Sequence, residues 1–288
     1  MAEPASIRFV KWDPVYEKER PFQIFADLLP DSQDKRKTNL SWEDHDVMVQ
    51  DIRGREDEFH IDTNGFMTRQ FQEFPDLLDR DMVEKEYLPA VEQLLKKELA
   101  DVGTVHILDW RVRSSEEQTI KDGKIMYSDW IQPLLPANYA HVDISPMGVV
   151  QRIQKLFPGV SDKIFRQRIR AVNVWKPLAN PVYQWPLAIC DGATVESDDL
   201  IETDSIRQGF RSSVYYPKYN KEQAWYYLKN QTPDEALIFK HFDSDPEVQM
   251  PMTIHSSVRQ HNAPESSLPR KSIEVRTFVF SDNFENEL

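Results

Sequence analysis

The chain has 288 residues, a formal net charge of −13 and a single cysteine, Cys190. Its length can bury one large hydrophobic core or two small ones. Its 40% hydrophobic and 29% charged residues are ordinary for a globular protein, which excludes an intrinsically disordered chain. The acidic balance argues against a nucleic-acid partner, and one cysteine excludes an internal disulfide framework or a cysteine-rich zinc site.

The first half of the chain predicts elements that support a core located further on. Residues 1–45 are polar and interrupted by prolines, and they predict an N-terminal arm. Residues 46–136 predict strands and one helix, in which Pro89 marks a kink or a helix start. The expected elements are strands at 47–52 and 59–61, a turn at 62–65, a helix at 79–99, a strand at 104–112 and a loop at 113–136.

Residues 137–288 predict the core itself. After a short helix at 146–156, β-rich runs alternate with Pro, Gly, Asn and Asp, which is typical of a sandwich or jelly roll and not of alternating βαβ units. We therefore expect residues 1–288 to form one domain that is mainly β with flanking helices. Strands are expected at 169–175, 185–189, 212–216, 224–228, 236–239, 253–255 and 272–280.

No stretch of the sequence suggests a membrane or secretory protein. The first residues lack the long apolar core of a signal peptide, and no later run approaches the length of a membrane span. We therefore expect a cytoplasmic protein with no membrane and no nucleic-acid partner.

The histidines suggest a transition-metal site. Non-haem iron enzymes use two histidines and one carboxylate, and two of these ligands often come as His-x-Asp, because alternate residues of a strand end point to one side. His255 ends an apolar run and is the candidate for the distant histidine, with His261, in a polar loop, as its rival. The chain contains three His-x-Asp pairs, which are His60-x-Asp62, His141-x-Asp143 and His241-x-Asp243.

Position along the chain separates the three pairs. The distant histidine must approach from the opposite sheet, so several strands must lie between it and the pair. Too few residues separate His241 from His255 to form these strands, and His60 precedes the strand-rich half of the chain. His141 and Asp143 are therefore the expected partners of His255.

The last expected strand opens with residues that suit a bound carboxylate. Side chains alternate between the two faces of a strand, so one face carries Arg270, Ser272, Glu274 and Arg276. A buried arginine requires an anion, and a guanidinium holds a carboxylate by two parallel hydrogen bonds. We expect Arg270 to hold the carboxylate, with the Ser272 hydroxyl as a second donor and Arg276 as the alternative. An internal ion pair between Glu274 and either arginine would also explain the pattern.

Six motifs, spread over most of the chain, carry a family resemblance. They are D-I-R-G (51–54), D-T-N-G-F (62–66), H-V-D-I-S (141–145), N-V-W-K-P-L (173–178), P-V-Y-Q-W-P-L-A-I-C-D (181–191) and P-R-K-S-I-E-V-R (269–276). In these motifs the sequence resembles the fungal and bacterial Fe(II)/2-oxoglutarate-dependent oxygenases grouped with gibberellin desaturase and the cephalosporin methoxylation-related hydroxylases.

The resemblance implies a double-stranded β-helix, which is a cupin-like jelly roll. It also implies Fe(II) at His141, Asp143 and His255, 2-oxoglutarate as a co-substrate at Arg270 and Ser272, and O2 as the oxidant. The implied reaction is the oxidation of an unactivated C–H bond of a small specialised metabolite, by hydroxylation, desaturation or ring formation.

Two points in the resemblance bear on the choice of residues. The interval between His255 and Arg270 is longer than is usual in the superfamily, so Arg276 stays as the alternative carboxylate ligand. The F-D-S motif (242–244) also fits the family and makes His241 incidental.

Several alternatives remain open at this point. Asn173 and Trp175 share one face of an expected strand and are candidates to line the co-substrate pocket, although a buried tryptophan beside a satisfied amide explains them equally well. An iron oxygenase that uses no 2-oxoglutarate is one rival function, and a non-catalytic β-sandwich that binds a small molecule or a protein is another. The substrate and the oligomeric state do not follow from the sequence.

Overall fold

The computed structural model describes most of the chain. No helix in this described part is long and apolar enough to cross a membrane. The described residues are 2–28, 31–74, 79–116, 131–207, 209–260, 264 and 266–284.

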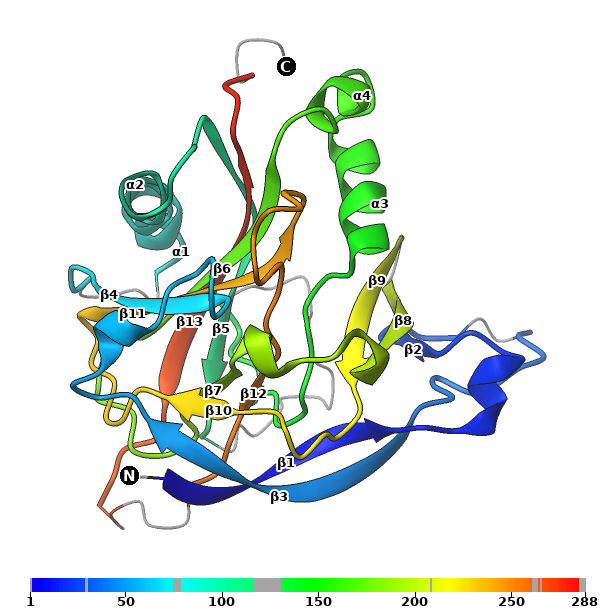
Figure 1. The fold of residues 1–288 in the computed structure, drawn as a ribbon, viewed down its shortest axis with the longest axis horizontal. Coiled ribbons are helices and arrows are strands. Elements are labelled where there is room, and N and C mark those ends of the chain that lie inside the picture. The colour runs from blue at the N-terminus through cyan, green and yellow to red at the C-terminus, as the bar shows by residue number, and fades with distance from the viewer. Residues whose placement is uncertain are drawn as a thin grey trace.

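The strands form two five-stranded sheets and one three-stranded sheet (Figure 1). Sheet 1 has the order β1 (Ala2–Lys11), β3 (Ser41–Asp51), β10 (Trp225–Tyr227), β7 (Leu187–Cys190) and β12 (His255–Ser257). Sheet 2 has the order β4 (Phe66–Gln70), β11 (Glu235–Asp243), β6 (Ile169–Pro177), β13 (Lys271–Phe280) and β5 (Thr104–Ser114). Sheet 3 contains β2 (Phe22–Ile24), β8 (Leu200–Arg207) and β9 (Phe210–Pro217).

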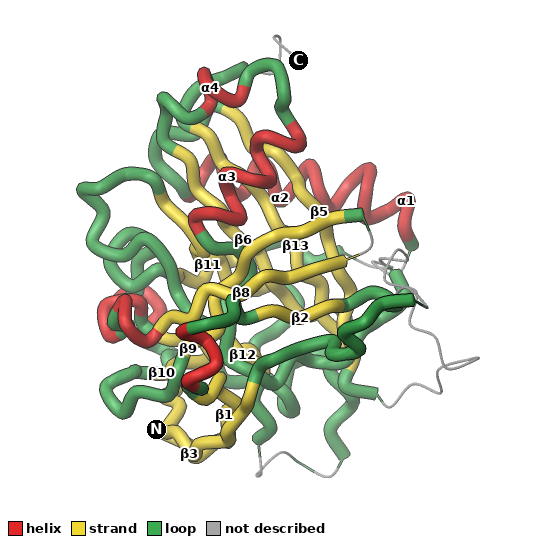
Figure 2. Tube along the Cα trace, turned by 90° about the vertical axis from the view of Figure 1, so that its right-hand side faces the viewer, coloured by secondary structure: helices red, strands yellow, loops and turns green. Residues whose placement is uncertain are grey.

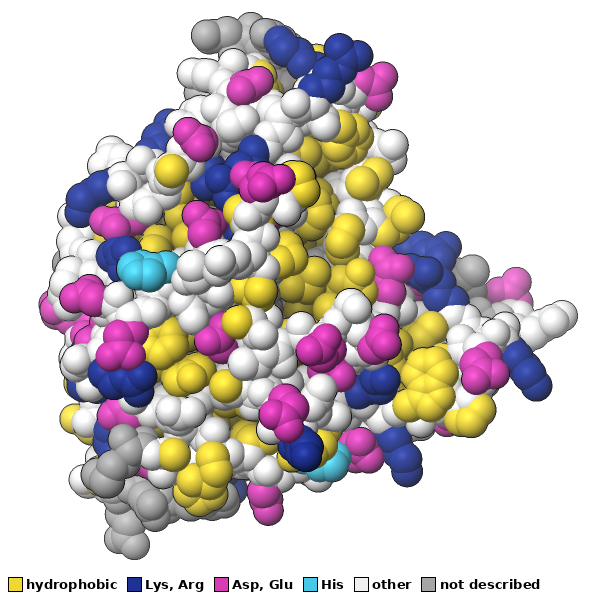
Figure 3. All heavy atoms as spheres, in the orientation of Figure 1, with side chains coloured by type: hydrophobic (Ala, Val, Ile, Leu, Met, Phe, Trp, Pro, Cys, Tyr) yellow, Lys and Arg dark blue, Asp and Glu magenta, His cyan; other side chains and the backbone are white. Residues whose placement is uncertain are grey.

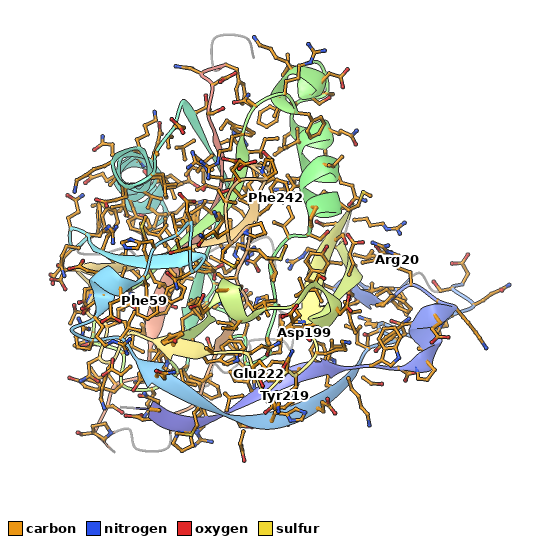
Figure 4. All side chains as sticks on the ribbon, viewed as in Figure 1. Arg20, Phe59, Asp199, Tyr219, Glu222 and Phe242 are labelled. Atoms are coloured by element: carbon orange, nitrogen blue, oxygen red, sulfur yellow. The ribbon has the colours of Figure 1, made fainter. Side chains whose placement is uncertain are left out.

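A hydrophobic core lies between sheets 1 and 2. Leu187 and Ile189 of β7, in sheet 1, form one apolar cluster with Trp175 of β6 and Phe239 of β11, in sheet 2. Phe59, from the loop before β4, extends this cluster (Figure 4). Because successive side chains of a strand point to opposite faces, each sheet turns one of its faces toward this core.

A helix covers the outer face of sheet 2 (Figure 1). It begins with α1 (Arg80–Met82), continues as a π-helical segment (Val83–Tyr87) and ends as α2 (Leu88–Glu98). Pro89 lies in the first turn of α2, directly after the π-helical segment, where the hydrogen-bonding pattern of the helix changes. The apolar stripe of α2 is buried in one cluster with the outward-facing residues of β6 and β13. The helix predicted at 79–99 is thus present, with a π-helical segment before the proline.

A second helix, α3 (Pro146–Leu156), lies on the other side of sheet 2 (Figure 2). The Ser145 hydroxyl caps it by accepting a hydrogen bond from the backbone N–H of Gly148. A Cβ at Gly148 would lie 2.4 Å from the backbone oxygen of Ser213 in β9, so glycine is what lets the helix approach that strand. The short α4 (Ser161–Ile164) follows. The 3-10 turns are Pro14–Glu17, Glu56–Glu58, Gly192–Thr194 and Ser197–Asp199.

The structure differs from the expected secondary structure in several places. The first 45 residues, expected as an N-terminal arm, contain β1, which pairs with β3 along its whole length and buries Ile7 and Phe9. Residues 59–61 are irregular and not a strand, since Phe59 is held by ring packing. β8 was not expected, because its sequence I-E-T-D-S-I-R is polar, yet it pairs with both β2 and β9. Of the expected loop at 113–136, residues 117–130 lie outside the described part.

Candidate metal centre

His141 and His255 are brought together by the backbone. They form an antiparallel bridge in which the His141 N–H donates to the His255 carbonyl at 3.1 Å and the His255 N–H donates to the His141 carbonyl at 3.0 Å. Directly opposed residues of an antiparallel pair carry their side chains on the same side. The two imidazole rings accordingly lie with their centroids 4.0 Å apart.

Asp143 completes a group of three possible ligands. It lies two residues after His141, so both side chains leave the extended backbone on one side. Asp143 Oδ1 lies 3.5 Å from His141 Nε2, and the ligand atoms of all three residues lie within 4.8 Å of one another. Two imidazoles and one carboxylate that leave other positions open form the facial set typical of non-haem iron.

Hydrogen bonding and burial prepare these groups to bind a metal. His141 Nδ1 lies 2.9 Å from the carbonyl oxygen of Tyr139, so Nδ1 carries the proton and Nε2 keeps its lone pair. Burial, together with His141 nearby, holds the pKa of His255 well below its usual range, so this imidazole is neutral at physiological pH. Burial opposes ionisation of Asp143, but Arg276 and the nearby histidines outweigh it and hold the pKa of Asp143 well below its usual range.

The second carboxylate oxygen of Asp143 is held by sheet 2. Arg276 Nε donates to Oδ2 at 3.0 Å, and Asn173 Nδ2 donates to the same oxygen at 2.7 Å. Arg276 Nη1 also donates to Asp109 Oδ1 at 3.3 Å, and Asn173 Nδ2 donates to Glu274 Oε1 at 2.7 Å. These contacts leave Oδ1 of Asp143 turned toward His141. Arg276 and Asn173 thus contact a candidate ligand, a contact that the sequence did not lead us to expect.

His241 lies at the same centre, although the sequence motifs made it incidental. Its Nδ1 accepts a hydrogen bond of 3.3 Å from the Asp143 backbone N–H, and its Nε2 lies 3.6 Å from Asp143 Oδ2. The side chain is 1% exposed, and burial lowers the pKa of His241 to about 4. A β-bulge between Lys240 and Phe242 turns His241 inward, a feature that strict alternation does not reveal.

The other candidate ligands lie elsewhere. Asp243 accepts hydrogen bonds from Lys240 and Arg168, and His60 is exposed. His261 lies outside the described residues. Within the described part of the chain, His141, Asp143 and His255 are the only such group that could hold a metal ion.

Arg270 is a buried cation with unused hydrogen-bond donors. It is 3% exposed, and its guanidinium carbon lies 5.5 Å from the centroid of the Trp175 ring. Nη1 donates to the Trp185 carbonyl at 2.6 Å and to Ser257 Oγ at 2.9 Å. Nε and Nη2 of Arg270 and Oγ of Ser272 are buried without a hydrogen-bond partner among the described residues. Burial lowers the pKa of Arg270 to about 9, as expected for a cation without an anion beside it.

Comparisons with known proteins agree with this arrangement. A family model described as an oxidoreductase/YMDC permease-like domain matches residues 7–280. An Fe(II)/2-oxoglutarate-dependent dioxygenase of Aspergillus novofumigatus, nvfI, is 30% identical over 252 residues, which cover 85% of this chain and 86% of that protein. The chain belongs to the Fe(II)/2-oxoglutarate-dependent dioxygenases.

Further comparisons place this dioxygenase among related enzymes. The hydroxylase/desaturase poxK of Penicillium oxalicum is 29% identical to this chain. The match covers 85% of this chain and 82% of poxK. A solved structure of the iron and alpha-ketoglutarate-dependent endoperoxidase NvfI matches with a TM-score of 0.82 and 28% identity, and covers 97% of this chain and 98% of that one. The predicted jelly-roll fold, the enzyme class and the need for Fe(II), 2-oxoglutarate and O2 are confirmed.

A cavity of about 180 Å³ opens from the candidate metal ligands of this dioxygenase. His141, Asp143, His241 and Arg276 line it together with residues of sheet 3 and α3. On the surface, hydrophobic side chains gather beside α3, whereas acidic and basic side chains are interspersed elsewhere (Figure 3). A small molecule can therefore approach the metal centre between sheet 3, α3 and sheet 2.

Proposed function

We propose that His141, Asp143 and His255 hold the Fe(II) of this dioxygenase, and that Arg270 and Ser272 hold the distal carboxylate of 2-oxoglutarate. The observation that carries the proposal is the convergence of three ligand atoms within 4.8 Å, from two segments that lie far apart in the sequence. The unused donors of Arg270 and the Ser272 hydroxyl support the second part, because a buried cation without a partner requires an anion.

The donor set fits both groups. Two neutral imidazoles and one carboxylate suit Fe(II), and a planar guanidinium beside a hydroxyl suits a carboxylate. Arg276 is less suited to the co-substrate, because it already faces the carboxylates of Asp143 and Asp109. Iron with bound 2-oxoglutarate and oxygen supplies the oxidant for a C–H bond, and succinate and carbon dioxide are the co-products.

The chain's own residues position these groups. Tyr139 fixes the His141 tautomer through its carbonyl oxygen, and Arg276 and Asn173 orient the Asp143 carboxylate. Trp175 lies against the guanidinium of Arg270 and excludes water from one of its faces. Rigid support of this kind keeps ligands in a productive geometry.

The related enzymes suggest the kind of reaction. Those that match are named hydroxylase/desaturase and endoperoxidase. We propose that this enzyme oxidises a C–H bond of a small specialised metabolite, by hydroxylation, desaturation or ring formation. Residues 1–288 acting as one domain, a cytoplasmic location, and the absence of nucleic-acid and membrane partners stay predictions.

Anaerobic titration of the metal-free protein tests the site assignment. Adding Fe(II) and then 2-oxoglutarate should produce a visible metal-to-ligand charge-transfer band. His255→Ala should abolish Fe(II) binding, whereas Arg270→Gln should retain Fe(II) and require more 2-oxoglutarate to develop the band. His60→Ala, at an exposed histidine, is the matched control and should behave as the wild type. A full band in His255→Ala would contradict the metal assignment.

A further inference from the structure

We propose that the substrate of this dioxygenase carries a carboxylate, and that Arg113, Arg152 and Arg207 bind it at the outer part of the cavity. We call these three residues the arginine rim. The proposal rests on the proposed function, because it places the substrate in the cavity that opens from the metal ligands.

The arginine rim is assembled from three separate elements. Arg113 comes from β5, Arg152 from α3 and Arg207 from β8, and all three line the same cavity. The chain as a whole has 48 acidic and 35 basic residues, so its composition works against such a concentration of positive charge. Like charges gathered in one cavity repel each other, and a bound anion would offset this cost.

The acidic residues of the cavity do not neutralise the rim. Asp109 and Asp143 are the acidic residues that line it, and both are paired with Arg276. None of the three rim arginines forms an ion pair with any residue that the structure describes. Burial, together with Arg276 nearby, lowers the pKa of Arg207, and the nearby Asp109 and Asp143 do not offset this effect.

Two of the three rim guanidinium groups lie over aromatic rings, and the rim keeps donors free. The Arg152 guanidinium carbon lies 4.7 Å from the centroid of the Phe210 ring, and that of Arg207 lies 5.0 Å from the Phe25 ring. Arg113 uses Nη1 to donate to the Leu135 carbonyl at 2.9 Å. A guanidinium stacked on a ring still has its in-plane N–H groups available, and these match the two oxygens of a carboxylate.

Apolar and aromatic side chains line part of the same cavity. Leu108, Ile144 and Val214 line it together with the aromatic rings of Tyr139 and Tyr216. This lining suits a hydrophobic body, with the anionic group directed outward and a C–H bond toward the metal. The expected substrate is therefore an apolar carboxylic acid and not a neutral hydrocarbon or a polar sugar.

The co-substrate does not account for Arg152 and Arg207 of the rim. Arg270 and Ser272, which offer buried donors for the distal carboxylate of 2-oxoglutarate, are absent from the cavity lining. Arg207, by contrast, lines the cavity. Arg113 lies directly opposite Ser272 in the pairing of β5 with β13, so it is also a neighbour of the co-substrate donors. Arg152 and Arg207 are therefore the cationic donors that suit a second carboxylate.

A pair of probes of equal shape tests the proposal. The full-length protein with Fe(II) and saturating 2-oxoglutarate is titrated anaerobically with 4-phenylbutanoate and, separately, with 4-phenylbutanamide, and binding is measured by calorimetry. The acid should bind at least tenfold more tightly than the amide. Arg152→Gln and Arg207→Gln should each reduce that preference about tenfold. Arg55→Gln, which removes an equal charge outside the cavity, should leave it unchanged.

The result that overturns the proposal is equal binding of acid and amide, or a preference that persists in both rim variants. A rim variant that instead weakens 2-oxoglutarate binding tenfold, read from the charge-transfer band, would assign the rim to the co-substrate and also overturn the proposal. Repeating the titration on the metal-free protein by ligand-observed NMR separates the two hypotheses. Loss of the charge-transfer band contradicts the metal site, whereas loss of the acid preference contradicts only the rim.

Discussion

Replacing Arg276 with glutamine should weaken Fe(II) binding without unfolding the protein. Its guanidinium donates to Asp143 Oδ2 at 3.0 Å and lies 3.3 Å from Asp109 Oδ1. A hydrogen bond to a charged group contributes roughly 1.5–3 kcal/mol. Because the Arg276 side chain is 23% exposed, we take the lower end, about 1.5 kcal/mol, which corresponds to roughly a tenfold loss of Fe(II) affinity. Losses of this size are typical when a group that orients a metal ligand is removed.

The same change should alter the pH dependence of metal binding. Arg276 helps to hold the pKa of Asp143 below its usual range, so its removal raises that pKa. With a raised pKa, protons compete with Fe(II) for Asp143 at higher pH. The acid limb of the pH profile, where Fe(II) affinity falls as the pH is lowered, should therefore move to higher pH. Anaerobic Fe(II) titrations between about pH 5 and pH 8 measure both effects.

A matched arginine provides the control. Arg53 also lies between two carboxylates, those of Glu235 and Glu56, and does not line the cavity. Arg53→Gln should therefore leave Fe(II) affinity within twofold of the wild type. An equal loss in both variants, or an unchanged acid limb in Arg276→Gln, would refute the reasoning.

Three further outcomes are expected. Arg270→Lys should weaken 2-oxoglutarate binding roughly tenfold and spare Fe(II), because lysine cannot reproduce the guanidinium fork; loss of Fe(II) in this variant would show that its effect is not local. His241→Leu should lower Fe(II) affinity severalfold in anaerobic titrations, since the Asp143 N–H loses its acceptor, and wild-type affinity would show that this contact is dispensable. Gly148→Ala should lower the free energy of unfolding by about 1–3 kcal/mol in thermal denaturation, because the new Cβ meets backbone at 2.4 Å, whereas Gly159→Ala, with nothing within 4 Å, should not.

The triad could be predicted because its signal lies in spacing and order. His141 and Asp143 are two residues apart. The number of strands expected before His255 selected this pair from the three His-x-Asp pairs of the sequence. The role of the backbone could not be predicted, since the His141–His255 bridge joins segments far apart in the sequence. Which two distant segments pair depends on the tertiary fold, and the periodicity of a single sequence does not reveal it.

The position of His241 shows why periodicity alone misleads. Strict period two would put His241 and Asp243 on one face, as a second metal motif. The bulge in β11 separates them, so that His241 faces Asp143 while Asp243 pairs with Lys240. A bulge inserts a residue without a sequence signature, and bulges occur often beside active sites.

The pairing of His141 with His255 also couples metal binding to the stability of the fold. His255 belongs to sheet 1, and Asp143 is hydrogen-bonded to sheet 2 through Arg276 and Asn173. A metal ion held by the triad would therefore cross-link the two sheets at the centre of the molecule. By linkage, a ligand that binds only the folded state stabilises that state. The backbone N–H groups of His141 and His255 should then exchange with solvent more slowly when Fe(II) is added, which hydrogen exchange can measure at single residues.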